Sequence, residues 1–267
     1  MMLRISAAQF EQLWFAQFTD KVSEHLRRYF ELPCRVAGDA CVRETIRLGV
    51  RRARRWGLTR EASAQSYIDH MVLLGSDFDS DPQLPWAREI LERRQPELVR
   101  LDSLHAQAAD FLAQSAGRGS RNVFFAVARA RMHGLCPELS VPPSQALEHV
   151  GAWLEWMYPE KYRLVRHRLP ELVARAEATA LTHGFERPRA LGRILGMTFL
   201  MGGGVCDDPM TPWVGGIVRD TQHTADEREE KLWTSLCAYA DRWLAEARTR
   251  GLVEREASEQ GAMSDVQ

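Results

Sequence analysis

The sequence is poor in cysteine and contains no Cys-x-x-Cys motif. Its five cysteines, an odd number, are spread over 267 residues, which is too sparse for a disulfide framework in a chain of this size. We therefore expect reduced thiols and a cytoplasmic location. The first 30 residues carry Glu11, Asp20 and Glu24 among their apolar positions. They match neither a signal-peptide core nor an apolar run of about 20 residues, so we expect neither general export nor a membrane span.

The chain also lacks a net charge of either sign. Thirty-five Lys and Arg residues stand against 36 Asp and Glu residues, which leaves a formal charge of -1. No overall field draws such a chain to nucleic acid or to an anionic membrane, so we expect no nucleic-acid partner and only local contacts with charged ones. The 45% of hydrophobic residues suffice for one large core or two ordinary ones.

Catalytic signatures are missing as well. The sequence contains no His-Glu-x-x-His, no Gly-x-Ser-x-Gly and no Gly-x-Gly-x-x-Gly, and the Gly202-Gly-Gly204 run has no Lys-Ser/Thr after it to form a phosphate loop. His133 and Cys136 are a single His-x-x-Cys pair without the second pair that a zinc site needs. We predict no catalytic residues, no cofactor and no metal. An enzyme or toxic effector with dispersed catalytic residues remains an alternative, since catalytic triads need no neighbourhood in sequence.

What the chain does contain is a segment that occurs twice. A shift of 127 positions (208 minus 81) lays residues 73–91 on residues 200–218 without a gap. Seven positions then match: Leu73, Gly75, Asp81, Pro82, Pro85, Trp86 and Ile90 fall on Leu200, Gly202, Asp208, Pro209, Pro212, Trp213 and Ile217. The same shift lays Gly57 on Gly184. A long internal period indicates repeated structural units, so we predict a degenerate tandem duplication.

The predicted fold is all-α, because apolar residues recur at helical spacing and alternating strand patterns are almost absent. In the first half we expect a helix that begins with a Ser6/Gln9 capping box and is ended by Pro33. A second helix covers 40–55, capped by Asp39 and closed by Gly57. Thr59 should cap a third, which Gly75 stops, and Pro85 should start a fourth.

The predicted organisation is two related helical domains. The N-terminal domain spans 1–116, a linker region with one helix spans 117–144, and the C-terminal domain spans 145–250, followed by a disordered tail over 251–267. The boundary lies at the flexible run Gly117-Arg-Gly-Ser120. A second capping box, Thr224 with Glu227, precedes the last long helix.

The repeated turn is interpreted as a determinant of the fold. The residues kept in both copies are Asp81, Pro82, Pro85 and Trp86, and Asp208, Pro209, Pro212 and Trp213. The Asp residues should cap the turns, and the Trp side chains should be buried against the preceding helices. Asp77, Asp79 and Asp81 also have the spacing of the first calcium ligands of a helix-loop-helix site. Such a site needs Gly where Pro82 stands and Glu where Arg88 stands, which disfavours calcium.

A basic stripe on the second helix is the candidate partner surface. It consists of Arg43, Arg47, Arg51, Arg54 and Arg55, which the second copy replaces with Pro170, Ala174, Ala178, Leu181 and Thr182. A solvated helix face is the usual explanation of such a stripe. Because only one copy carries it, the fold does not require it. We predict that the stripe, together with Asp77 and Asp79, contacts a protein partner.

Residues 1–95 resemble small helical accessory proteins encoded beside type VI secretion spike and effector genes in Gram-negative bacteria. The resemblance rests on Leu3-Arg-Ile-Ser-Ala-Ala-Gln9, Trp56-Gly-Leu-Thr59, the helix end at Tyr67–Gly75, Asp77-Phe-Asp-Ser-Asp-Pro82 and Pro85-Trp86. It implies a non-enzymatic adaptor or chaperone that holds an effector or spike component. An immunity protein that neutralises a cognate toxin is the alternative, and the resemblance supplies no catalytic residues.

Overall fold

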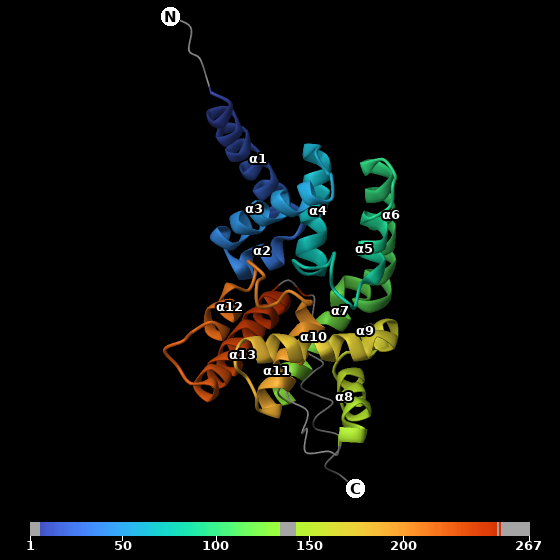
Figure 1. Cartoon of the computed structure of the whole chain (residues 1–267), viewed down its shortest axis with the longest axis vertical. Helices are drawn as coiled ribbons and strands as arrows, with labels where there is room; N and C mark the ends of the chain where they lie inside the picture. Colours follow the sequence, from blue (N-terminus) through green and yellow to red (C-terminus); the bar gives the residue numbers. More distant parts are fainter. Residues whose placement is uncertain (1–5, 134–142, 250, 252–267) are drawn as a thin grey trace, which may run out of the picture.

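All regular structure in the described part of the chain is helical. The computed structural model describes residues 6–133, 143–249 and 251, and within these ranges it contains helices and turns but no strand (Figure 1). The all-α prediction is therefore confirmed. Cys136, part of the predicted linker region (134–142) and nearly all of the predicted tail lie outside the described residues.

The first half of the chain forms a helical layer of its own (Figure 1). Its helices are α1 (Ala7–Tyr29), α2 (Glu31–Ala37), α3 (Asp39–Arg55), α4 (Glu61–Leu74), α5 (Pro85–Leu91) and α6 (Glu97–Ser115). They enclose one apolar core, in which Val22, Ile46, Tyr67 and Leu104 are fully buried.

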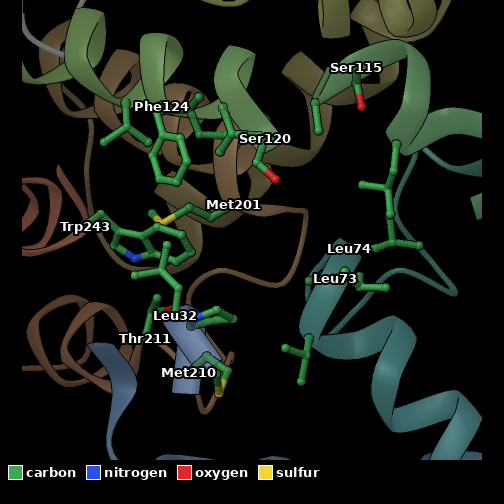
Figure 2. A pocket seen from close by; sticks show the side chains of 18 of the residues that line it. Leu32, Leu73, Leu74, Ser115, Ser120, Phe124, Met201, Met210, Thr211 and Trp243 are labelled. Atoms are coloured by element: carbon green, nitrogen blue, oxygen red, sulfur yellow. The ribbon is translucent and has the colours of Figure 1, made fainter. Parts of the chain in front are cut away.

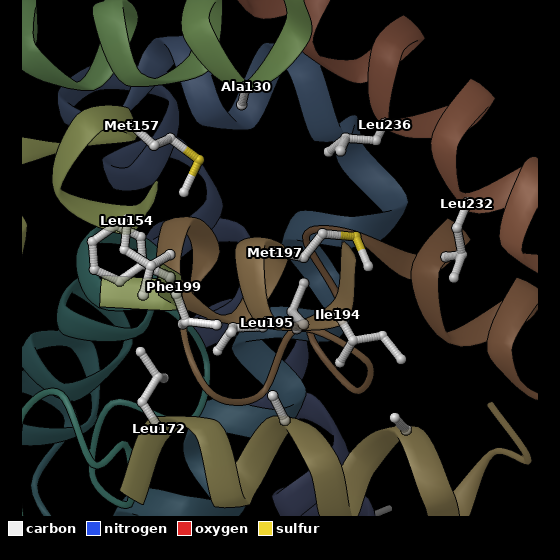
Figure 3. Close-up of a cluster of buried hydrophobic side chains, with 14 of the residues drawn as sticks. Ala130, Leu154, Met157, Leu172, Ile194, Leu195, Met197, Phe199, Leu232 and Leu236 are labelled. Carbon is white, nitrogen blue, oxygen red and sulfur yellow. The ribbon is translucent and has the colours of Figure 1, made fainter. Parts of the chain in front are cut away.

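The second half begins after a short 3-10 turn, η1 (Arg118–Ser120). Its helices are α7 (Arg121–His133), α8 (Pro143–Met157), α9 (Pro159–Val165), α10 (Leu169–Thr182), α11 (Pro188–Met201), α12 (Pro212–Val218) and α13 (Ala225–Thr249), with a second 3-10 turn, η2 (Arg166–Arg168), before α10. Figure 3 shows the second core, whose buried side chains include Leu154, Phe199 and Leu232. The linker helix α7 belongs to this core, because Ala126 and Ala130 are buried in it.

Helix ends follow the predicted capping in part. In the Ser6/Gln9 box, Gln9 N–H donates to Ser6 Oγ at 3.2 Å and Ser6 N–H donates to Gln9 Oε1 at 2.9 Å. The Thr224/Glu227 box is also formed, with Thr224 N–H to Glu227 Oε2 at 2.8 Å and Glu227 N–H to Thr224 Oγ1 at 3.3 Å. Both capping boxes are confirmed.

Three local predictions were wrong. Pro33 does not end the first helix; α1 ends at Tyr29, and Pro33 lies in the first turn of α2, where its missing N–H has no helical partner to lose. Asp39 is the first residue of α3 instead of its cap, and its carboxylate pairs with Arg27. Thr59 does not cap α4, because its N–H and hydroxyl both donate to Glu97.

Helix bounds repeat at the sequence offset of 127. Adding 127 to the bounds of α4 gives 188 and 201, the bounds of α11; adding it to those of α5 gives 212 and 218, the bounds of α12. Backbone angles repeat too: φ is 99° at Gly75 and 104° at Gly202, where each glycine ends a helix in a conformation that a side chain rarely adopts. Descent from a duplication stays a prediction; what the structure shows is that the pair α4 and α5 and the pair α11 and α12 have matching bounds.

Candidate functional site

The five arginines of the predicted stripe are all exposed on α3. Two of them connect α3 to α1: Arg43 pairs with Asp20 at 3.0 Å, and Arg54 pairs with Glu11 at 3.2 Å. Arg47 and Arg51 share the single carboxylate of Glu44, the latter at 3.9 Å. The stripe is therefore partly neutralised by its own surroundings.

A positive surplus nevertheless remains on this face. Four of the five guanidinium groups pair with three carboxylates, and Arg55 forms no ion pair with a described residue. The five arginines therefore exceed these carboxylates by two positive charges. The surplus lies around Arg47, Arg51 and Arg55, away from the α1 contact. The geometry thus narrows the candidate surface from five arginines to these three.

Asp77 does not belong to this exposed surface, so its assignment to the partner contact is corrected. Its side chain lies where the turn after α4 meets the turn after α11, a contact between the two halves that we call the seam. There it forms ion pairs with Arg52 of α3 and, at 3.1 Å, with Arg175 of α10. Only 16% of the side chain is exposed. Since the carboxylate already has two cationic partners, it joins the halves and is not free for a separate protein.

Asp79 is corrected for the same reason. It is buried, and its Oδ2 accepts hydrogen bonds from Trp56 Nε1 at 2.7 Å and from the Tyr67 hydroxyl at 2.6 Å. These bonds hold the turn after α4 against α3 and α4. The alternate spacing of Asp77, Asp79 and Asp81 therefore sends three carboxylates to three different sets of partners.

Asp81 and Asp208 form the centre of the seam. Each caps its own turn, with Gln83 N–H donating to Asp81 Oδ1 and Met210 N–H donating to Asp208 Oδ1, both at 2.8 Å. The capping role predicted from sequence is thus observed in both turns. Each carboxylate also crosses to the other half, where Asp81 accepts from Gly203 N–H at 2.6 Å and Asp208 accepts from Ser76 N–H at 3.0 Å.

Glycines let the two turns approach each other. A Cβ atom on Gly75 would lie 2.7 Å from the Met201 carbonyl oxygen, and one on Gly202 would lie 3.1 Å from the Leu74 carbonyl oxygen. Because 74 plus 127 is 201, these are the same contact seen from each half. The repeated motif therefore builds the interface between the halves as well as the two turns.

The repeated tryptophans are only half-buried, and they pack on the helices that follow them. Trp86 lies against Phe111 of α6, with ring centroids 6.3 Å apart, and Trp213 lies against Tyr239 of α13 at 5.8 Å. Both touch the core of their own half. The burial is therefore less complete than predicted, and the ring contact of each Trp is with the next helix in the chain.

Beside the seam lies a cavity of about 650 Å³. Figure 2 shows residues from both halves around it, among them Leu32 of α2, Leu74 of α4, Phe124 of α7 and Trp243 of α13. Leu73 and Tyr29, both exposed, also line it. Most of the side chains drawn in Figure 2 are apolar, so the cavity suits an apolar occupant.

A cation, Lys161 of α9, also lines this cavity. Its ammonium group donates to the carbonyl oxygen of Phe199 and lies 5.3 Å from the centroid of the Phe199 ring. Burial lowers the pKa of this ammonium group to about 8, and the charge of Asp81 opposes that shift. Within the described residues no carboxylate forms an ion pair with Lys161. Lys161 is half-buried, so its ammonium group is a partly desolvated charge beside an apolar space.

Sequence reasoning missed Lys161 because no motif surrounds it. The sequence offset of 127 could have pointed to Lys161, because it aligns position 161 with position 34. Position 34 holds Cys34, which is buried in the first core. A lysine that replaces a buried apolar residue of the other half is a one-copy feature, like the arginine stripe. Only the structure shows that it lines a cavity.

Comparisons with known proteins identify no relative. No family model, no curated protein and no solved structure matches the chain. In the part of the chain that the structure describes, no helix combines the length and the apolar character that crossing a membrane requires.

Proposed function

We propose that the protein is a non-enzymatic binding accessory, an adaptor or chaperone that holds a protein partner. The observation that supports this proposal is the exposed positive surplus at Arg47, Arg51 and Arg55 on a molecule whose net charge is only -1. Exposed charges contribute only about 0 to 1 kcal/mol each to folding, and the equivalent face of α10 lacks them. A surface that folding does not need is available for recognition.

The partner that fits this surface is an acidic protein. Guanidinium groups bind carboxylates in a fork geometry and are favoured at interfaces. The surplus is small and confined to about three turns of one helix, which is short for a nucleic-acid backbone, whose binding draws on many phosphate contacts. Because residues 1–95 resemble accessory proteins of type VI secretion, a secreted effector or spike component is the first partner to test.

The test is co-expression with the products of the genes beside its own, followed by a measurement of binding at low salt. The double variant Arg47→Glu/Arg51→Glu should weaken binding by about tenfold, or 1.4 kcal/mol. The matched control is Arg93→Glu/Arg94→Glu, which makes the same change in charge at two exposed arginines between α5 and α6 and should leave the affinity unchanged. Equal affinities of the two double variants would reject the stripe as the interface.

The same complex separates the candidate roles. A chaperone leaves its partner active and exportable, whereas an immunity protein abolishes the partner's toxicity. Toxicity of this chain when it is expressed alone, lost on a single polar substitution, would instead identify an enzyme and overturn the proposal.

A further inference from the structure

The cavity beside the seam has the size of a ligand site. Protein interiors are close-packed, and voids much larger than a water molecule are few, whereas small-molecule sites measure about 300–1,000 Å³. At about 650 Å³, the space between the two cores falls within that range. It also lies where such sites are common, at the junction of two packed units.

The apolar side chains that line the cavity indicate that most of a bound ligand would be apolar. Side chains from α2, α4, α7 and α13 contribute Leu32, Leu74, Phe124 and Trp243, and Met201 and Leu236 close other parts of the wall. A peptide would bring several N–H and C=O groups into this space, and each buried group needs a hydrogen-bond partner. A hydrocarbon chain has no such groups and needs no hydrogen-bond partner, so the apolar lining favours a hydrocarbon chain over a peptide.

The positive charge of Lys161 indicates that a ligand would carry a negative charge. Lys161 is half-buried, and charges withdrawn from water are usually paired. Within the described residues, the only hydrogen bond of its ammonium group goes to the Phe199 carbonyl oxygen, which leaves two of its three donors for a ligand. The carboxylate of Asp81, which also lines the cavity, is taken by Gly203 N–H and Gln83 N–H. Cys34 at the equivalent position of the other half shows that this fold does not require a lysine there.

We propose that the cavity binds a small amphipathic molecule, an apolar chain that ends in a carboxylate, as in a medium-chain fatty acid, and that Lys161 binds its carboxylate. The chain lies against the apolar wall between the two halves, and the carboxylate accepts hydrogen bonds from the ammonium group. This site goes beyond the proposed function, since it is separate from the arginine stripe and needs no protein partner.

The experiment uses the full chain and titrates three probes that share one C12 chain: dodecanoate, dodecanol and dodecyltrimethylammonium. Calorimetry gives affinity and stoichiometry. The change in total tryptophan fluorescence, to which Trp233 and Trp243 of the cavity wall contribute, gives a second readout. We expect one dodecanoate per chain, with dodecanol and the cationic probe bound at least about tenfold more weakly. Lys161→Met should lower dodecanoate affinity to that of dodecanol and leave dodecanol binding unchanged.

Two further variants keep the result interpretable. Lys21→Met removes an exposed lysine of α1 that pairs with Glu61, and it should leave dodecanoate affinity unchanged. Lys161→Cys installs the residue that the other half carries, and it should fold even if Lys161→Met does not. With dodecanoate carrying ¹³C at its carboxyl carbon, the wild type should show one bound carboxyl resonance, and Lys161→Cys should shift or abolish it.

Three outcomes would overturn the proposal: no saturable binding of dodecanoate, equal affinity for dodecanoate and dodecanol, or unchanged dodecanoate affinity in both Lys161 variants. Tighter binding of an acetylated Leu-Phe-Leu peptide than of dodecanoate would also reject the fatty-acid assignment. Loss of partner binding in the arginine-stripe variant affects none of these readouts, so the two proposals fail independently.

Discussion

Asp81 and Asp208 each bind the backbone of the opposite half of the chain. Asp81 accepts from Gly203 N–H at 2.6 Å, and Asp208 accepts from Ser76 N–H at 3.0 Å. The offset of 127 aligns Asp81 with Asp208 and Ser76 with Gly203, so the two hydrogen bonds join equivalent positions in opposite directions. The two contacts across the axis of a symmetric dimer are related in the same way. One motif thus serves twice, once within its own turn and once across the seam.

The first prediction concerns Asp208→Ala. The carboxylate is 8% exposed, and its loss leaves the Ser76 and Met210 N–H groups without their acceptor. A buried donor without a partner costs about 1–3 kcal/mol. Burial raises the pKa of this carboxyl group because it removes the charged form from water. The Ala variant no longer has this desolvation cost, which offsets part of the loss. We expect a net destabilisation of about 2–4 kcal/mol in urea unfolding.

Coupling across the seam is tested by the double variant Asp81→Ala/Asp208→Ala. Residues that act in one network give non-additive effects, with coupling of about 0.5–3 kcal/mol. The double variant should therefore lose less stability than the sum of the single variants. If the two losses of stability were strictly additive, each Asp would cap its own turn independently of the other.

The second prediction concerns Gly204, the counterpart of Asp77 (77 plus 127 is 204). The two residues face each other, and a Cβ atom on Gly204 would lie 2.7 Å from Asp77 Cβ. Gly204→Asp should therefore destabilise through both crowding, which costs about 1–3 kcal/mol, and repulsion of two carboxylates. Thermal unfolding of the purified variant measures the loss.

The exchange variant Asp77→Gly/Gly204→Asp supplies the control. It moves one carboxylate across the seam while leaving the total volume and charge unchanged, and Arg52 and Arg175 reach the seam from opposite halves. It should be more stable than Gly204→Asp alone. If it melts lower than either single variant, the seam does not have the two-fold character inferred here.

The third prediction concerns the half-buried tryptophans. Deleting a buried Trp costs about 3–5 kcal/mol, and because Trp86 and Trp213 are half-buried we expect Trp86→Ala and Trp213→Ala to fall near the lower end, at about 3 kcal/mol. Trp213 Nε1 is buried without a hydrogen-bond partner among the described residues. Trp213→Phe should therefore recover most of the stability of Trp213→Ala, and a Phe variant as unstable as the Ala variant would contradict this.

Local chemistry made much of the fold predictable. Gly75, Pro85 and the capping pairs fix helix ends through backbone geometry, which depends on near neighbours in sequence. The offset of 127 alone aligns Asp81 with Asp208. It cannot show that their carboxylates exchange partners, because such bonds depend on how two packed halves meet.

The candidate site was less predictable for the same reason. Asp77 and Asp79 looked like surface carboxylates because their spacing carries no information about Arg175, Trp56 or Tyr67, which reach them through tertiary packing. Lys161 has no motif around it, since its role depends on a cavity built by distant helices. The arginine stripe was found because helical periodicity alone exposes it.

The last prediction concerns the response of stability to pH through His70. Its side chain is 2% exposed on α4, with one ring nitrogen 2.7 Å from the Ser66 carbonyl oxygen and the other, Nε2, buried without a partner among the described residues. Burial lowers the pKa of His70, and the charge of His105 on α6 lowers it further. The Asp69 carboxylate on the same helix pairs with His25 of α1.

A histidine whose pKa is lower in the folded state binds protons more readily when unfolded. Stability from neutral His70 is therefore fully present above the unfolded pKa of about 6.5 and is lost as the pH falls below it, by at most about 1.4 kcal/mol per pH unit. Urea unfolding between pH 7.5 and 5 should show a shallower acid loss for His70→Leu than for the wild type. His105→Gln, at an exposed site, should keep most of the wild-type slope. Identical slopes for His70→Leu and the wild type would contradict the prediction and assign the acid sensitivity to other groups.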